Sequence, residues 1–535
     1  MTSQRFRYFI LILTLISGIF LFLPHINFQP ALAPGDHGRD LYCFEAVLKG
    51  DLPYKDFWWV YGPLMPYYYG LFFKILGVNI QSVLLGKLLL NLIMGMAIFL
   101  SLGLFIPLLF AYIGTLWFWV FNPDFFFTYN HIGGITLLTI IIYNLFYYIR
   151  YSSFRHIVQG LFTAFLLCLV KINFGIIAAL LFLIIVTMTN KINGVSLSPK
   201  QKRSLRVLFI AFGVAIFTVY FSLIRNLSLA EIRQCFPYLS SDHPQNAAPV
   251  SMLMRWWEAI ALTINKDWPN RFFSFIIIMA IVQVALHFNK PSVDSAYKKK
   301  ILMAIITLCL FYFLNIHEFF MSGVLYRAAW SQPFSILLIF LFIGLAAKGL
   351  SKTVRVLLFS TFFLIITLQN LWITQAIQLK KNPLQFLDFE KGQVYTGNDS
   401  SWKQVLRQTV SYLRDHVSED ENFLALPYDP LYYYLCDKPS PSRQLIFFEH
   451  INIPEEQEEK IITELEQQRV NWVVISNRAL SDYPGLGVLG ETYCPVIGKY
   501  LNEEFEINRT FGFWVPTSDW IYPPGMRILK RKNPL

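Results

Sequence analysis

Residues 34–70 read PGDHGRDLYCFEAVLKGDLPYKDFWWVYGPLMPYYYG and follow the first hydrophobic run of the chain directly. Five acidic residues crowd into the first part of this stretch: Asp36, Asp40, Glu45, Asp51 and Asp56. Its second part is rich in proline, tryptophan and tyrosine, a composition typical of segments at a membrane surface. A carboxylate cluster next to a bilayer is therefore the first place to look for chemistry.

The first half of the stretch has the pattern of a short amphipathic helix. Leu41, Phe44 and Val47 recur at helical spacing, and Gly50 stands where a helix C-cap belongs, with Pro53 just beyond. We expect this helix to lie in the membrane interface, followed by a second interfacial or half-buried helix within residues 57–76.

The composition of the 535-residue chain is that of a polytopic membrane protein. Hydrophobic residues make up 55%, aromatic residues 17% and charged residues only 15%. Hydrophobic runs long enough to cross about 30 Å of hydrocarbon recur along the sequence. They predict about eleven transmembrane helices, at residues 8–24, 79–104, 106–122, 132–149, 157–171, 174–190, 207–224, 272–289, 301–316, 333–347 and 355–373.

Charge is distributed unevenly between the two parts of the chain. Residues 1–373 hold 28 basic and 12 acidic residues, whereas the remainder holds 17 basic and 22 acidic ones. The basic residues lie mostly in every second loop between hydrophobic runs, and of the acidic ones only Asp294 falls there. The positive-inside rule then predicts a cytoplasmic N-terminus and an extracytoplasmic C-terminus. A nucleic-acid partner is not expected, because such proteins gather their basic residues on one face.

After Trp372 the pattern changes to alternating helices and strands. Helices are expected at residues 401–417, 429–436 and 454–469, and strands in NFLALP (422–427), RQLIFF (443–448) and VNWVVIS (470–476). This indicates a small α/β domain. The predicted division is therefore a membrane domain over 1–373, whose first outer loop spans 25–78, and an extracytoplasmic α/β domain over 374–535.

The six cysteines show no CxxC or Cys/His spacing, so the sequence assigns no metal ligands. Cys436 and Cys494 fall in the same predicted domain and could pair in an oxidising compartment. Unpaired packing is an equal alternative.

Asp36 is the main catalytic candidate. It stands at the start of the first outer helix, between Gly35 and His37, where a carboxylate could take a proton from an incoming hydroxyl. The alternative is that Asp36 is only the N-cap of the helix. Asp40 and Glu45 are secondary candidates, with solvated helix faces as the alternative.

Basic and titratable groups recur at the outer membrane edge. Lys171, Arg327 and His317 could together hold a lipid phosphate, whose charge must be neutralised as it leaves. Lys171 and Arg327 could instead snorkel to headgroups, and His317 could pair with the neighbouring Glu318. Two residues of the second outer loop could join the carboxylates or merely cap the flanking helices: Asp124 and His131.

The chain resembles the GT-C glycosyltransferases, integral membrane enzymes that take sugar from a polyprenyl-phosphate carrier. The likeness is to bacterial members related to the protein mannosyltransferases and the lipid A aminoarabinose transferases. It rests on Asp36-x-Gly38, then AVLKGDLPYKDF (46–57) and YGPLMPYYYGLFFKILG (61–77). The segment YDPLYYYLCDKPSPSR (428–443), which ends in Arg443, also resembles a recurring element of their outer domains.

The resemblance implies that Asp36 is the catalytic base, because an Asp of the first outer loop has this role in the family. Several members carry adjacent acidic residues in this loop, whereas here His37 follows Asp36. Asp36 would then act alone or with Asp124. A divalent metal cofactor stays possible, with no ligands assigned.

The sequence hypothesis is an inverting sugar transferase of the cytoplasmic membrane. A polyprenyl-phosphate sugar is the expected donor, and a glycan, lipid or protein is the expected acceptor, on the extracytoplasmic face among membrane lipids. A non-catalytic transporter or lipid flippase with an outer sensor domain is the rival, and a polymerase or ligase with a lipid-diphosphate donor is a third possibility. Transporters tend to show ionisable residues at mid-span and repeated halves, which this sequence lacks apart from Lys87.

Overall fold

The computed structural model describes residues 4–121, 129–236, 295–322, 327, 330–397, 400–483, 485–518 and 524–534. The chain divides into two compact units. The first comprises Met1–Pro24, Lys87–Thr218 and Ala247–Ala376, and the second His25–Gly86, Val219–Asn246 and Ile377–Leu535. The boundary predicted between residues 373 and 374 separates membrane-embedded from extracytoplasmic residues. The division into compact units does not test that boundary.

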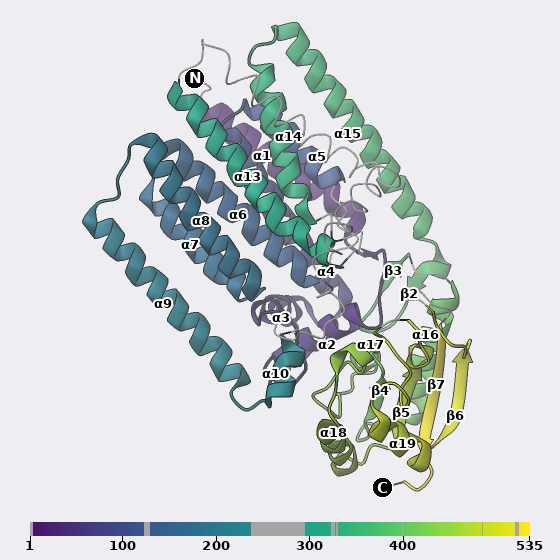
Figure 1. Ribbon diagram of the computed structural model, residues 1–535. Helices are drawn as coiled ribbons and strands as arrows, with labels where there is room; N and C mark the ends of the chain where they lie inside the picture. Colours follow the sequence, from purple (N-terminus) through teal and green to yellow (C-terminus); the bar gives the residue numbers. More distant parts are fainter. Residues whose placement is uncertain are drawn as a thin grey trace. The chain divides into compact units, whose positions relative to one another are not determined.

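The first unit consists of long apolar helices (Figure 1). Neighbours in sequence pack together, with α6 against α7 and α7 against α8, as short loops between antiparallel helices favour. The helices are α1 (Gln4–Phe22), α4 (Ile80–Gly103), α5 (Leu108–Phe121), α6 (Tyr129–Tyr151), α7 (Phe154–Cys168), α8 (Ile172–Asn193), α9 (Pro199–Ile224), α13 (Ser295–Ser322), α14 (Gln332–Ala347) and α15 (Lys352–Lys380).

The protein is a multi-pass membrane protein. Among the described residues, seven helices are long and apolar enough to cross a bilayer, and α5, α7 and α14 are shorter apolar helices. Each of the ten predicted spans that fall on described residues coincides with one of these helices. The eleventh, at 272–289, lies outside the described residues, and the total number of spans stays a prediction.

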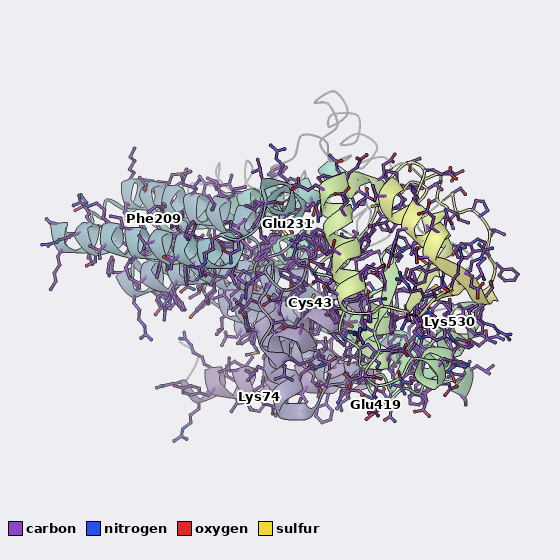
Figure 2. All side chains as sticks on the ribbon, turned by 90° about the horizontal axis from the view of Figure 1, so that it is seen from below. Cys43, Lys74, Phe209, Glu231, Glu419 and Lys530 are labelled. Carbon is purple, nitrogen blue, oxygen red and sulfur yellow. The ribbon has the colours of Figure 1, made fainter. Side chains whose placement is uncertain are left out.

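In the most apolar part of helix α9 and of helix α15, only 6% of the residues are buried within the described structure. Phe209 on α9 is 48% exposed, and Leu364 on α15 is 58% exposed; Phe209 is labelled in Figure 2. In water such faces would be an aggregation hazard. Lipid contact explains them, because hydrocarbon is as apolar as the side chains themselves.

The second unit combines segments that are far apart in sequence. From the first loop come β1 (Phe28–Gln29), α2 (Asp36–Lys49) and α3 (Leu64–Leu76), and from the middle of the chain α10 (Leu229–Cys235), while η1 (Leu23–His25) spans the boundary between the units. The C-terminal part adds η6 (Pro383–Gln385), β2 (Phe386–Leu387), β3 (Val394–Thr396), α16 (Ser400–His416), β4 (Phe423–Leu426), α17 (Leu431–Cys436), η7 (Glu449–Ile451), α18 (Glu455–Gln467), β5 (Trp472–Ser476), η8 (Asn477–Ala479), α19 (Pro495–Glu504), β6 (Phe505–Gly512) and β7 (Gly525–Arg531).

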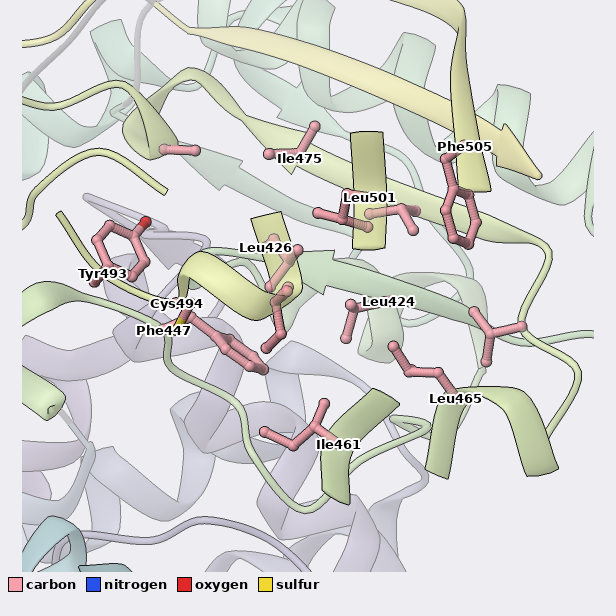
Figure 3. Packing of buried hydrophobic residues seen from close by; sticks show 14 residues of the cluster. Leu424, Leu426, Phe447, Ile461, Leu465, Ile475, Tyr493, Cys494, Leu501 and Phe505 are labelled. Atoms are coloured by element: carbon pink, nitrogen blue, oxygen red, sulfur yellow. The ribbon is translucent and has the colours of Figure 1, made fainter. Parts of the chain in front are cut away.

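A four-stranded mixed sheet organises this unit. Its strand order is β4-β5-β7-β6, in which β4 and β5 are parallel and the other pairs antiparallel. Leu424 of β4 and Ile475 of β5 pack with Leu465 of α18 and Leu501 of α19 in one apolar core (Figure 3). A second, small sheet joins the first loop to the C-terminal part, because β1 pairs in parallel with β3.

The structure confirms the predicted fold class, a helical membrane protein with a C-terminal α/β region. The strand predicted in RQLIFF is wrong, since residues 444–448 have no ladder. In this segment Phe447 N–H donates to the carbonyl of Pro427, and the carbonyl of Arg443 accepts from Trp58 N–H. The two hydrogen bonds join the segment to two different loops. They therefore do not form the regular series with one partner strand that a β-strand requires. Cys436 and Cys494 are both free thiols, which agrees with unpaired packing.

Candidate active site

Helix α2 begins at Asp36, and two glycines let its first turn lie against the loop after β4. A Cβ atom at Gly35 would stand 2.6 Å from the ring of Tyr428, and one at Gly38 would stand 2.3 Å from the backbone nitrogen of Leu431. Carbon atoms do not approach so closely, so only glycine allows this packing. The first turn of α2 therefore contacts the segment between β4 and α17 directly.

The side chain of Asp36 is held through one of its two oxygens. Its Oδ1 accepts a hydrogen bond from Nη1 of Arg39 at 3.3 Å and another from the hydroxyl of Tyr428 at 3.0 Å. Oδ2 accepts no hydrogen bond from any residue that the structure describes, and the side chain is 48% exposed. The carboxylate is thus oriented by Oδ1 and accessible at Oδ2.

The N-cap interpretation of Asp36 is wrong. The N-cap of α2 is Gly35, and no side chain in the described part of the chain makes a capping hydrogen bond at this end of the helix. The Asp36 carboxylate instead faces Arg39 and Tyr428, which are hydrogen-bonded to each other at 2.9 Å. We refer to Asp36, Arg39, Asp40 and Tyr428 as the Asp36 cluster.

Arg39 is fixed on all sides of its guanidinium group. Its Nε and Nη2 donate to Oδ1 of Asp40 at 3.0 Å and 2.6 Å, a charge-assisted pair. The guanidinium carbon lies 5.4 Å from the ring centroid of Trp59 and 5.1 Å from that of Tyr61, at cation–π range. The Arg39 side chain is only 2% exposed. Because this arginine has little freedom, it defines the position of Asp36 Oδ1.

The local charges keep Asp36 ionised. Burial raises the pKa of its carboxyl, although half of the side chain stays accessible, and the charge of Arg39 with the hydrogen bond from Tyr428 lowers it more. Smaller contributions from His37 and Arg478 lower the pKa further, so the net shift is downward. Burial raises the pKa of Tyr428 well above its usual value, so this hydroxyl keeps its proton.

Tyr428 stands at the carboxyl end of β4, beside the carboxyl end of its parallel neighbour β5. Next to it, the Asp429 carboxylate accepts a hydrogen bond from the hydroxyl of Ser476 at 2.7 Å, and burial raises the pKa of Asp429. Nη1 of Arg478, in η8, donates to the carbonyl of Tyr428 at 3.3 Å. Ligands of open parallel α/β sheets bind at the carboxyl ends of the strands, and here this end of the parallel β4-β5 pair meets the start of α2.

Asp40 and Glu45 do not lie on solvated faces, so that alternative is wrong. Asp40 is 0% exposed and Glu45 6%. Oε1 of Glu45 lies 2.9 Å from Nζ of Lys49 and 2.8 Å from Nζ of Lys391, and both lysines also pair with Asp437. A helix face that is polar by composition is here covered by the C-terminal part of the chain.

Arg443 belongs to a separate set of contacts. Its Nε lies 3.4 Å from Oε1 of Glu231 on α10, and its Nη1 donates to the carbonyl of Tyr54 at 3.0 Å. None of these contacts includes the Asp36 cluster. They join α10, the segment between α2 and α3, and the C-terminal part, so we interpret Arg443 as a structural residue.

In the first unit, the two predicted phosphate-binding cations meet at one carboxylate. Nζ of Lys171 lies 2.5 Å from Oε1 of Glu318, and Nη1 of Arg327 lies 3.7 Å from Oε2 of the same residue. The side chains of Lys171, Glu318 and Arg327 are 13%, 6% and 20% exposed. The charged side chains that the structure describes in this group are thus two cations and one anion.

The two predicted histidines, His131 and His317, each lie next to an aromatic ring that also contacts Lys171. Nζ of Lys171 lies 4.5 Å from the ring centroid of Phe174 and 5.6 Å from that of Trp330. His131 stacks on Trp330 with centroids 3.9 Å apart, and His317 lies 5.3 Å from Phe174. We refer to Lys171, Glu318, Arg327 and Trp330 as the Lys171 cluster. Asp124, the remaining candidate, lies outside the described residues.

The described residues do not fit a metal centre. Among them, no three His, Cys, Asp or Glu side chains lie close enough to share an ion. Oδ1 of Asp36 and Oδ1 of Asp40 both face the guanidinium of Arg39, which a cation would have to displace. No chemical step is therefore assigned to a metal here.

Sequence reasoning did not single out Arg39, Tyr428 or Trp330 as members of the two clusters. The spacing of Asp36 and Arg39, three residues apart, places both on one side of a helix and was a usable signal. Tyr428 directly follows a predicted strand, but its approach to Asp36, 392 residues earlier, has no sequence signal. The sequence suggests Glu318 only as a partner of the neighbouring His317, whereas the structure shows its carboxylate paired with Lys171 and Arg327.

Comparison with solved structures identifies the fold. The chain matches the oligosaccharyltransferase of Archaeoglobus fulgidus in its apo form over 89% of this chain and 70% of that one, with a TM-score of 0.51 and 11% identity. The complex of the same enzyme with Zn and sulfate matches over 88% and 68%, with a TM-score of 0.50 and 10% identity. ArnT from Cupriavidus metallidurans in the apo state matches 98% of both chains, but its TM-score of 0.42 is too low to support a conclusion.

No protein-family model matches the chain, and no curated protein matches it. The class is nevertheless defined by the fold. The chain is a multi-pass membrane protein with the fold of the matched archaeal oligosaccharyltransferase and a C-terminal α/β region, which supports the predicted resemblance at the level of fold.

Proposed function

We propose that the protein is a membrane glycosyltransferase that transfers a sugar from a polyprenyl-phosphate donor to an acceptor hydroxyl on the extracytoplasmic face. The observation that carries the proposal is the state of Asp36. Its carboxylate is ionised, oriented at Oδ1 by Arg39 and Tyr428, and accessible at Oδ2. The GT-C fold supports the same function, because the matched archaeal protein is an oligosaccharyltransferase.

In the proposed reaction, Oδ2 of Asp36 takes the proton of the acceptor hydroxyl. The acceptor oxygen attacks the anomeric carbon of the sugar while the bond from this carbon to the phosphate oxygen breaks. The bonding electrons leave with the polyprenyl phosphate, and the configuration at the anomeric carbon inverts. General-base assistance of this kind contributes about 10²- to 10⁴-fold to rate.

The departing lipid phosphate gains negative charge and needs cations. We assign this role to Lys171 and Arg327, with His317 as a further candidate near the same rings. Their pairing with Glu318 keeps the two cations close together although both are largely buried. Phosphate binding would replace or share the contacts of this single carboxylate, at a site with little water, where charge interactions are strong.

The test is sugar transfer in membranes from radiolabelled polyprenyl-phosphate sugars, with wild type beside Asp36→Asn. The substitution keeps the size of the side chain and removes the base. We expect a loss of about 10²-fold or more in transfer with unchanged thermal unfolding of the purified protein. Asp56→Asn is the matched control, because Asp56 lies in the same loop and its carboxylate contacts Leu52 N–H and Nζ of Lys55, neither of which belongs to the Asp36 cluster.

Two outcomes contradict the proposal in different ways. Full transfer by Asp36→Asn would remove Asp36 as the base and turn attention to Asp124. No transfer by wild type from any such donor would leave the transporter or flippase hypothesis ahead, with Lys87, buried on α4, as its first residue to test.

A further inference from the structure

The hydroxyl of Tyr428 lies between the two charged groups of the Asp36 cluster. It is 2.9 Å from Nη1 of Arg39 and 3.0 Å from Oδ1 of Asp36. The three groups form a closed triangle, because Arg39 Nη1 also reaches Asp36 Oδ1 at 3.3 Å. Asp36 and Arg39 come from the first loop, whereas Tyr428 comes from the C-terminal α/β region.

We propose that Tyr428 is a positioning residue for the catalytic base, and that the α/β region thereby completes the active site of the first loop. This inference rests on the proposed function of Asp36 and adds a residue to it. Tyr428 acts on the acceptor hydroxyl only through the Asp36 carboxylate.

The direction of each hydrogen bond follows from the chemistry of the donors. An arginine side chain carries only donors, so the oxygen of Tyr428 must accept from Arg39. The phenol hydroxyl has a single proton, and with this proton it donates a hydrogen bond to Oδ1 of Asp36. Oδ1 is then occupied by two donors, and Oδ2 is the oxygen that remains for the acceptor proton. A carboxylate held this way presents one defined oxygen in one defined direction.

The backbone around Tyr428 is positioned by contacts on both sides. Its carbonyl accepts from Arg478, and the neighbouring Asp429 accepts from Ser476 at the end of β5. The missing side chain of Gly35 leaves room for the tyrosine ring. The Tyr428 ring therefore lies between the end of β4 and the first turn of α2. This packing restricts the positions that its hydroxyl can take.

The proposal predicts a change in pH dependence as well as in rate. The groups that face Asp36 from its own helix and from the elements packed against it are Arg39, His37, Tyr428 and Arg478. Removal of the Tyr428 proton donor weakens the stabilisation of the ionised carboxylate, so the pKa of Asp36 rises. The ionised form is the active base, and the acidic limb of the rate profile therefore moves to higher pH.

The experiment compares Tyr428→Phe with wild type in the transfer assay across pH. We expect kcat to fall on the order of tenfold, the KM for the donor to change little, and the acidic limb to rise by about one pH unit. Tyr434→Phe is the matched control, since the hydroxyl of this buried tyrosine of α17 donates to the carbonyl of Lys391, which is outside the Asp36 cluster. The control should leave the acidic limb where it is in wild type.

A double variant separates positioning from a purely structural role. If Tyr428 acts through Asp36, Tyr428→Phe adds no further loss of activity to Asp36→Asn. An independent titration follows the reaction of the Asp36 carboxyl with a water-soluble carbodiimide, read by mass spectrometry across pH. Its midpoint should be higher in Tyr428→Phe than in wild type.

The outcomes distinguish the two proposals. An unmoved acidic limb and an unmoved carbodiimide midpoint in Tyr428→Phe overturn the positioning role, even where wild type transfers sugar and Asp36→Asn does not. Additive losses in the double variant overturn it as well. A wild type without transfer overturns the proposed function, while the carbodiimide midpoint still reports whether Tyr428 acts on Asp36.

Discussion

At the scale of single residues, the two clusters show how buried charges are kept in place by partners. Arg39 is shared between Asp36 and Asp40, and Glu318 is shared between Lys171 and Arg327. Each central group is almost fully buried, so its desolvation is offset only by complete pairing. A charge in such a position can be exchanged for a ligand charge, but it is costly to remove.

Lys171 gives the residue-scale prediction for donor binding. In Lys171→Met, the KM for the polyprenyl-phosphate sugar should rise at least about tenfold with a smaller change in kcat, because a charge-assisted contact with phosphate is lost. Lys171→Arg should stay within a few-fold of wild type. Steady-state transfer kinetics at two salt concentrations measure the effect, and Lys298→Met, near the start of α13 on the predicted cytoplasmic side, is the control.

The alternative for Lys171 is that it only neutralises Glu318. In that case the double variant Lys171→Met/Glu318→Gln, which removes both charges, would restore the KM of wild type. We expect the double variant to recover thermal stability and to keep the raised KM. Recovery of both would contradict a role in phosphate binding.

At the scale of elements, the start of α2 can pack closely against the segment around Tyr428 and Leu431 because Gly35 and Gly38 have no side chains. Gly38→Ala tests this contact. Alanine favours an isolated helix over glycine by about 1 kcal/mol, but its Cβ would stand 2.3 Å from the backbone nitrogen of Leu431. Backbone does not yield as a flexible side chain does, so we expect a net destabilisation of about 2 kcal/mol and reduced transfer.

Gly213 on α9 is the matched control for Gly38. A Cβ at this position meets no atom of the described residues within 4 Å. Gly213→Ala should therefore leave thermal unfolding in detergent unchanged or slightly raised. An equal loss of stability in both variants would show that helix packing at Gly38 is not the cause.

At the scale of the whole molecule, the distribution of basic residues predicts the orientation in the membrane. Alkaline phosphatase fused after Leu535 should be active, because this enzyme works only outside the cytoplasm, and the same enzyme inserted at residues 194–198, between α8 and α9, should be inactive. A fluorescent protein that folds only in the cytoplasm should give the opposite pattern at the two positions. The reverse result at both would place the Asp36 cluster on the cytoplasmic side and contradict transfer at the outer face.

The sequence by itself determined the membrane class, ten of the predicted spans, the alternation of helices and strands after Trp372, and Asp36 as a candidate. These features depend on local composition and hydrophobic periodicity, which can be read from the sequence without knowledge of distant contacts. Only the tertiary structure decided that Asp40 and Glu45 are buried, that RQLIFF is no strand, and which groups touch Asp36. Tyr428 reaches Asp36 across 392 residues, and Lys171 reaches Glu318 across 147. Such contacts depend on the packing of whole elements, and a hydrogen bond between distant side chains leaves no periodic trace along the chain.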